Sequence, residues 1–294
     1  MRHSTAIFAA SLLCATSAHA DDEIPPVIGG KTYTQHMVIT AKARHPEIVS
    51  IVVEGKHGNG NKGDVAVLGS TSAPATVLKS VARPDISTGG KVSSDSQHYV
   101  SRLPFNSSTG HRIGTIVITF AYKKGASTAA HDATAQAIAA SMARSTLSPK
   151  NAADPYPWDP KFSPDTYGQQ LAMRMVAKYP DLLVIMIHAT PPGGGKNVVI
   201  GSNIGRIGKI ADEDDLRVIE KGSTNLEVGG DDNDRFETEV PLNDASGKRI
   251  GALGLVFAYN AKTDKDAVHA HGRAIRDDLA SHIPASAALF KPAR

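Results

Sequence analysis

Apolar and polar positions along the chain follow one pattern that occurs twice. Three apolar residues at four-residue spacing open each copy, namely Tyr33, Met37 and Ala41 in the first and Tyr167, Leu171 and Met175 in the second. This spacing predicts a helix with one apolar face. Each helix must end before a proline, Pro46 or Pro180, because the residue that precedes proline is disfavoured in the helical region.

Strands follow each opening helix in the same order. A short run that is apolar at nearly every residue, 48–53 or 182–187, predicts a strand buried on both faces. A second strand ends at Gly69 or Gly201, and after a less similar middle segment two further strands form a hairpin around a glycine-containing turn. The last strands are predicted over 113–122 and 250–259, and closing helices over 127–145 and 264–282.

Short matching segments show that this is an internal repeat. The matches are Thr32-Tyr33-Thr34-Gln35 with Thr166-Tyr167-Gly168-Gln169, Val67-Leu68-Gly69-Ser70 with Val199-Ile200-Gly201-Ser202, and Gly110-His111-Arg112-Ile113-Gly114 with Gly247-Lys248-Arg249-Ile250-Gly251. The sequence therefore predicts two copies of one α+β domain, over 31–147 and 165–284, joined by a proline-rich linker over 148–164.

This order of elements resembles the extracytoplasmic PAS-like fold of Cache sensor domains. The resemblance rests on the helix, the two strands, the variable middle and the closing hairpin, together with Val240-Pro241-Leu242-Asn243 before the Gly-x-x-Ile-Gly turn at 247–251. It implies that each copy is an antiparallel sheet flanked by helices and that the protein binds small molecules. Cache domains usually sit between membrane helices of receptors or kinases, and the sequence predicts neither such helices nor an output domain.

The first 20 residues have the organisation of a secretory signal peptide. Arg2 and His3 precede an apolar stretch over 5–16, and Ala18-His19-Ala20 fits a small-x-small cleavage site. The stretch is too short to anchor the chain in a bilayer, and no later segment has the ~18 consecutive apolar residues of a membrane helix. We expect cleavage near Ala20 and a periplasmic or secreted product that does not span a membrane.

Cleavage changes the composition in one respect that matters for function, because Cys14 is the only cysteine of the 294 residues. The mature protein is then expected to lack disulfides, thiolate metal sites and a cysteine nucleophile. Lys+Arg 32 against Asp+Glu 29 gives a net charge of only +3, while 41% of the residues are hydrophobic. This composition predicts packed cores and no basic tract for a phosphate backbone, so nucleic acid is not expected as a partner.

Candidate catalytic and metal-binding motifs are incomplete. His269 and His271 are two residues apart in a predicted helix, so their imidazoles point to opposite sides and do not share one ion. The acidic run Asp212–Asp215 lies where a helix start favours negative charge, and the glycines at 193–195 lack the spacing of a phosphate loop. No cofactor, metal or enzymatic activity is therefore predicted.

The resemblance to Cache domains also implies where a ligand binds, between the sheet and the variable middle segment. Residues near that location are Arg83, Tyr99 and Tyr122 in the first copy and Arg206, Arg217 and Tyr259 in the second. An arginine there is able to pair with a carboxylate or phosphate of a ligand. The competing interpretation places the tyrosines in the core and the arginines on the surface.

Three functions stay open on the sequence alone. The leading hypothesis is an exported protein that binds or senses a small organic molecule through duplicated PAS-like domains. The second is a non-catalytic interaction protein that docks on a membrane receptor or another periplasmic component. The third is a metal-dependent enzyme.

Overall fold

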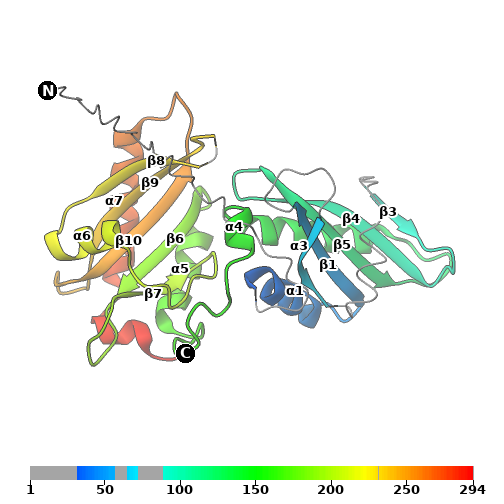
Figure 1. The fold of residues 1–294 in the computed structure, drawn as a ribbon, viewed down its shortest axis with the longest axis horizontal. Coiled ribbons are helices and arrows are strands. Elements are labelled where there is room, and N and C mark those ends of the chain that lie inside the picture. Colours follow the sequence, from blue (N-terminus) through cyan, green and yellow to red (C-terminus); the bar gives the residue numbers. More distant parts are fainter. Residues whose placement is uncertain (1–31, 57–64, 72–88, 231, 294) are drawn as a thin grey trace, which may run out of the picture.

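The structure is a computed structural model that describes residues 32–56, 65–71, 89–230 and 232–293. The predicted signal peptide, the middle segment of the first copy and Arg83 lie outside these residues. Within them the chain forms two five-stranded antiparallel sheets, each flanked by helices (Figure 1). The α+β class and the layout of two similar halves are thereby confirmed.

The two halves contain the same elements in the same order. The N-terminal half consists of α1 (Tyr33–Arg44), β1 (Ile48–Lys56), β2 (Val65–Ser70), β3 (Gly89–Val92), β4 (His98–Asn106), β5 (Arg112–Ala121), α3 (Ala129–Arg144) and α4 (Pro149–Ala152). The C-terminal half consists of α5 (Tyr167–Lys178), β6 (Leu182–Ala189), β7 (Val198–Ser202), α6 (Glu213–Lys221), β8 (Asn225–Gly229), β9 (Arg235–Asn243), β10 (Arg249–Ala258), α7 (Lys265–Ser281) and the 3₁₀ helix η1 (Ser286–Phe290).

Strand order and register repeat as well. The order is β2-β1-β5-β4-β3 in one sheet and β7-β6-β10-β9-β8 in the other. The register of β1 against β2 shifts after Val53, and that of β6 against β7 shifts after Ile187, the matching residue. A β-bulge is a specific local feature of a sheet. Its recurrence at the matching position is therefore evidence for the repeat in addition to the sequence matches.

The Thr-Tyr-x-Gln segment of each half links the opening helix by hydrogen bonds to the second strand, β2 or β7. Thr166 caps α5 by accepting from the backbone N–H of Gln169, and the side-chain amide of Gln169 both donates to the carbonyl of Ser202 and accepts from its N–H. Thr32, Gln35 and Ser70 form the same bonds in the N-terminal half. The matching sequence segments therefore encode one three-dimensional joint.

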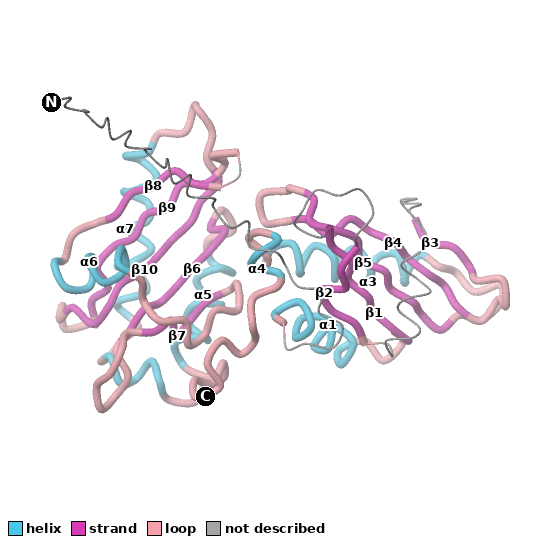
Figure 2. Tube along the Cα trace, in the orientation of Figure 1, coloured by secondary structure: helices cyan, strands magenta, loops and turns pink. Residues whose placement is uncertain are grey.

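Each sheet buries one face under two long helices. In the C-terminal half α5 and α7 pack on this face, where alternate residues such as Ile185, Leu253 and Leu255 are fully buried. In the N-terminal half α1 and α3 cover the equivalent core around Ile51 and Ile116. Figure 2 shows these helices lying along the sheets, with α4 located between the halves.

The opposite face of the C-terminal sheet has a different cover. Helix α6 contacts β9 and β10 there, and Leu147 of the N-terminal half packs near Val184 and Val256 on the same face. Asp212 and Asp215 form a capping box at the start of α6, so two residues of the acidic run serve the helix start as predicted.

Two features of the fold were not predicted. The edge strands β3 and β8 add one strand to each sheet, and their sequences, Gly-Gly-Lys-Val and Asn-Leu-Glu-Val-Gly, lack a buried apolar face. The predicted linker begins with helix α4, whose N-cap Ser148 accepts from the backbone N–H of Asn151. Proline at the first helical position favours such a start, although a proline-rich segment as a whole indicates a linker.

Candidate functional site

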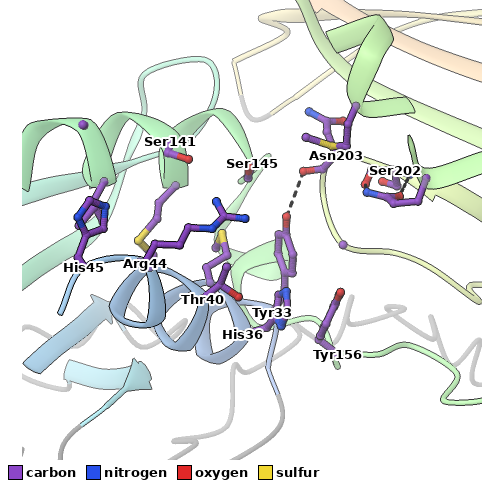
Figure 3. Close-up of a pocket in the computed structure, with 18 residues that line it drawn as sticks. Tyr33, His36, Thr40, Arg44, His45, Ser141, Ser145, Tyr156, Ser202 and Asn203 are labelled. Atoms are coloured by element: carbon purple, nitrogen blue, oxygen red, sulfur yellow. Dashed lines mark hydrogen bonds between the residues drawn. The ribbon is translucent and has the colours of Figure 1, made fainter. Parts of the chain in front are cut away.

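A cleft of about 410 Å³ lies between the two halves, which is within the range of small-molecule sites. Its walls are α1 and α3 of the N-terminal half and the turn that follows β7 of the C-terminal half (Figure 3). The side chains of Tyr33, His36, Thr40 and Arg44 line it from α1. Their spacing of three or four residues puts them on one side of the helix, and that side faces the cleft.

The floor of the cleft is fixed by a hydrogen-bond network across the halves. The Tyr33 hydroxyl donates to the carbonyl of Asn203 at 3.1 Å, and the Asn203 amide donates to the carbonyls of Leu183 and Arg144. Burial raises the pKa of Tyr33, so its phenol stays neutral and acts as a donor. A side chain on Gly205, whose φ is +79°, would overlap the Tyr33 ring, so glycine is required for this close approach.

An ion pair next to the cleft joins the halves. Arg206 Nε lies 3.1 Å from Asp154 Oδ2, and the same carboxylate oxygen accepts from the amide of Asn151. The Asn151 amide also donates to the carbonyl of Ile204 in the C-terminal half. These groups are buried or half-buried, so the contact holds the cleft walls in one relative position.

His36 stacks on Tyr156 with ring centroids 4.0 Å apart. Burial and, to a lesser degree, the charge of Arg44 lower the pKa of His36 below its usual value. The imidazole is therefore neutral at pH 7, with its ring positioned by the stack and available to a ligand as a hydrogen-bond donor or acceptor.

Arg44 brings a positive charge to the cleft, and no acidic side chain among the described lining residues pairs with it. Arg44 projects between α1 and α3 in Figure 3, and no hydrogen bond or ion pair to it is formed by the other described residues. No aspartate or glutamate is among the described residues that line the cleft. Hydroxyls of Thr40, Ser141 and Ser145 and apolar groups of Met37, Ile138 and Met173 complete the walls. The arrangement suits a ligand with one negative group and an apolar body.

A cluster of three polar side chains is buried under α6 in the C-terminal half. His188 of β6, Asp215 of α6 and Glu239 of β9 are 1%, 7% and 3% exposed, and His188 Nε2 lies 3.4 Å from Asp215 Oδ1. Burial and the neighbouring Asp215 raise the pKa of Glu239 to about 9, and burial lowers the pKa of His188. Glu239 and His188 are therefore both neutral at pH 7.

The ligand-binding residues predicted from the sequence do not gather at one place. Tyr99 is buried on the α3 side, where its hydroxyl donates to Asp132, and Tyr122 packs beside the same core. Arg217 is exposed on α6 and pairs with Asp214. Arg206 forms the ion pair between the halves, Tyr259 packs near Phe236, and Arg83 lies outside the described residues.

Arg44 and His36 were missed by the sequence reasoning. Both lie on the helix face marked by Tyr33 and Met37, and this face was predicted from its apolar members alone. A signal was present, because Arg44 is in helical register with Tyr33 immediately before the end of the helix. The C-terminal half lies opposite this face of α1. Residue spacing along the helix does not show which part of the protein packs against it.

The candidate metal ligands have other partners. His269 Nδ1 lies 2.8 Å from the Thr238 hydroxyl, whereas His271 Nε2 lies 3.2 Å from Asp181. In the described part of the chain, no group of three or more histidine, cysteine, aspartate or glutamate side chains is arranged to hold a metal ion. None of the helices in that part is long and apolar enough to cross a membrane.

Comparisons with known proteins give little further information. No family model matches the sequence, and no curated protein matches it. Among solved structures, the crystal structure of the E. coli DhaR(N)-DhaL complex is similar with a TM-score of 0.27 and 12% identity, over 78% of this chain and 85% of that chain. A TM-score this low carries no argument about fold or function.

Proposed function

We propose that this protein binds a small organic anion in the cleft between its halves, as an exported binding or sensing protein built from two PAS-like domains. The observation that carries the proposal is Arg44, a cation without a partner among the described residues, in a cleft whose described lining contains no carboxylate. Arg44 is exposed, so a carboxylate that enters the cleft reaches its guanidinium and pairs with it through two parallel hydrogen bonds.

The fold supports the PAS-like part of this proposal. In each half the opening helix, two strands, closing hairpin and final helix occur in the order on which the resemblance was based. In the C-terminal half a helix, α6, occupies the variable middle position. Export and cleavage near Ala20 are proposed from the sequence alone.

The ligand class follows from the two sides of the cleft. Arg44 and the neighbouring His36 recognise the negative group, and the thioethers and the aliphatic side chains of Met37, Ile138 and Met173 contact an apolar body. An aromatic or short aliphatic carboxylate has both parts. Inorganic phosphate has only the charge, and a neutral amide of the same shape has only the body.

A thermal-shift experiment on the mature protein separates these contributions. We expect benzoate to raise the midpoint of unfolding, inorganic phosphate to raise it less, and benzamide to leave it unchanged, because only a ligand bound by the folded state stabilises it. Arg44→Gln abolishes the benzoate response, whereas Arg217→Gln, which removes an exposed arginine elsewhere, retains it.

The opposite outcomes are equally clear. A benzoate response that persists in Arg44→Gln would place the anion elsewhere, and no response to benzoate, hexanoate or amino acids at millimolar concentration would reject ligand binding in the cleft. In the latter case, a stoichiometric partner recovered from periplasmic extract would favour the docking function instead.

A further inference from the structure

A second cavity, of about 380 Å³, lies in the C-terminal half between α6 and the loop that joins β6 to β7. Its volume is close to that of the cleft and within the range of small-molecule sites. The segment from Gly208 to Ala211 forms one side of it. Hydrogen bonds from Ala211 to Asn197 and from Gly208 to Val199 hold this segment along the free edge of β7, so regular structure defines the cavity.

A buried amide borders this cavity without a full set of partners. Asn197 is only 6% exposed, and its Oδ1 has no hydrogen-bond partner among the described residues. Its Nδ2 reaches the hydroxyl of Thr190, which also lines the cavity, but the distance of 3.5 Å is long for a hydrogen bond. Buried acceptors are nearly always hydrogen-bonded in folded proteins, so a donor is expected at this oxygen.

The fold does not require an amide at this position. Asn197 immediately precedes β7, and the register that the two sheets share makes Val65 of β2 its counterpart in the N-terminal half. The side chain of valine forms no hydrogen bonds, and the equivalent strand pair forms with it. The amide of Asn197 is therefore present for a reason other than strand pairing.

The remaining lining of the cavity is apolar on one side and carries no net charge. Ile210, Leu216 and Ile219 contribute aliphatic side chains. Ile210 and Leu216 are 49% and 37% exposed, so the protein itself leaves part of this apolar surface uncovered. Lys196 and Glu220, which also line the cavity, are exposed and have opposite charges. This lining fits a neutral ligand with an apolar body.

The glycine run at 193–195, which lacks the spacing of a phosphate loop, leaves the cavity open at the β6–β7 loop. A Cβ added at any of these three glycines would meet no other atom within 4 Å. The last torsion of an asparagine side chain has a broad energy profile, and only the 3.5 Å contact with Thr190 holds it in Asn197. Its Oδ1 is therefore able to turn toward a donor that enters the cavity.

From this arrangement we infer that the cavity is a second binding site, for a small neutral molecule with a hydroxyl group on an apolar body, such as a phenol. The hydroxyl donates to Asn197 Oδ1 and accepts from the Thr190 hydroxyl, which has no acceptor of its own among the described residues. The body contacts Ile210, Leu216 and Ile219. The described residues that line this cavity and those that line the cleft do not overlap, so the two sites are separate.

Ligand-observed NMR titration of the mature protein with p-cresol tests the inference. The methyl ether of p-cresol has the same body but no hydroxyl proton, so we expect it to bind about tenfold more weakly. Asn197→Leu is expected to weaken p-cresol binding about tenfold and to change the affinity for the ether by less than about twofold. If Asn197 only supported the structure, its replacement would weaken the binding of both compounds equally.

A second variant tests the apolar side of the cavity without disturbing the buried amide. Leu216 is exposed on α6, and Leu216→Gln is expected to weaken the binding of both compounds about threefold or more, because it removes an apolar contact. Leu226→Gln, an exposed leucine on β8 outside the cavity, is the matched control and changes either affinity by less than about twofold. Together with the ether, Leu216→Gln decides the matter if Asn197→Leu does not fold.

The opposite results overturn the inference. They are no binding of p-cresol at millimolar concentration, equal binding of p-cresol and its ether, or unchanged p-cresol binding in a folded Asn197→Leu or in Leu216→Gln. Arg44→Gln, which tests the cleft, is expected to leave p-cresol binding intact, and loss of binding in that variant would place p-cresol in the cleft instead. Failure of this site is therefore distinct from failure of the proposed anion site.

Discussion

The two halves of the molecule agree on one face of their sheets and differ on the other. The helix-covered cores repeat almost residue for residue, whereas His188 and Glu239 of the C-terminal half replace Glu54 and Arg102 at the matching register positions. In the N-terminal half Arg102 partly offsets the burial that raises the pKa of Glu54. In the C-terminal half no arginine takes that position.

This difference distinguishes residues that the fold requires from residues that are present for another reason. A core that both halves share is accounted for by stability alone. Polar groups that differ at equivalent positions are not required by the fold, because the other half folds without them. The polar cluster of His188, Asp215 and Glu239 under α6 and the cleft between the halves are therefore the places where a role particular to this protein is expected.

The largest expected effect tests the shared core. A side chain on Gly114 would overlap the carbonyl oxygen of Glu54, and one on Gly251 would overlap that of His188. We expect Gly114→Ala and Gly251→Ala each to lower the free energy of unfolding by more than about 3 kcal/mol, because backbone cannot give way cheaply.

Chemical denaturation of the two variants measures this loss. Gly229→Ala is the control, since a side chain there meets open space. If one of the two variants were as stable as the wild type, the halves would not share the constraint that the Ile-Gly step encodes.

A smaller effect is expected where α1 is hydrogen-bonded to β2 and α5 to β7. Gln169→Leu leaves both backbone groups of the buried Ser202 without the amide, which costs about 1–3 kcal/mol. Gln35→Leu costs less, because Ser70 is only half-buried and water replaces the amide. Denaturation with exposed Gln136→Ala as the control measures both, and a larger loss for Gln35→Leu would contradict the comparison.

The buried Glu239 of the C-terminal half predicts a dependence of stability on pH. Glu239 keeps its proton to about pH 9 in the folded state but loses it at the ordinary carboxyl pKa when unfolded. The folded state therefore binds more protons, and stability falls as the pH rises between these two values. Glu239→Gln is expected to flatten this decline and to be more stable than the wild type at pH 8. Unfolding curves at pH 5 and pH 8 that differ equally in both proteins would contradict it.

The smallest effect concerns an arginine that the sequence placed near a ligand. Arg217 forms an exposed ion pair with Asp214, so Arg217→Ala is expected to change stability by at most about 0.5 kcal/mol and to leave benzoate binding intact. Loss of benzoate binding in this variant, measured by calorimetry, would restore the location implied by the Cache resemblance.

The sequence predicted the elements that are determined by local signals within each half. Periodicity at Tyr33 and Tyr167, the prolines after both helices and the Gly-x-x-Ile-Gly turns determine local structure, so the paired elements were predictable. Edge strands β3 and β8 were not, because an exposed edge needs no apolar alternation. The cleft was not predictable for another reason: Arg44 and Asn203 line it from different halves, and spacing along the chain does not show how the halves pack.

The binding of an anion beside His36 is the central claim, and the imidazole itself reports on it. Proton NMR of the mature protein, with His36→Asn to assign the resonance, gives the pKa of this ring with and without benzoate. Burial and Arg44 lower the pKa of the free protein, and a nearby carboxylate is expected to raise it, so benzoate binds more tightly as the pH falls through that range. A His36 resonance that neither moves nor changes its pKa while benzoate is bound would contradict the account.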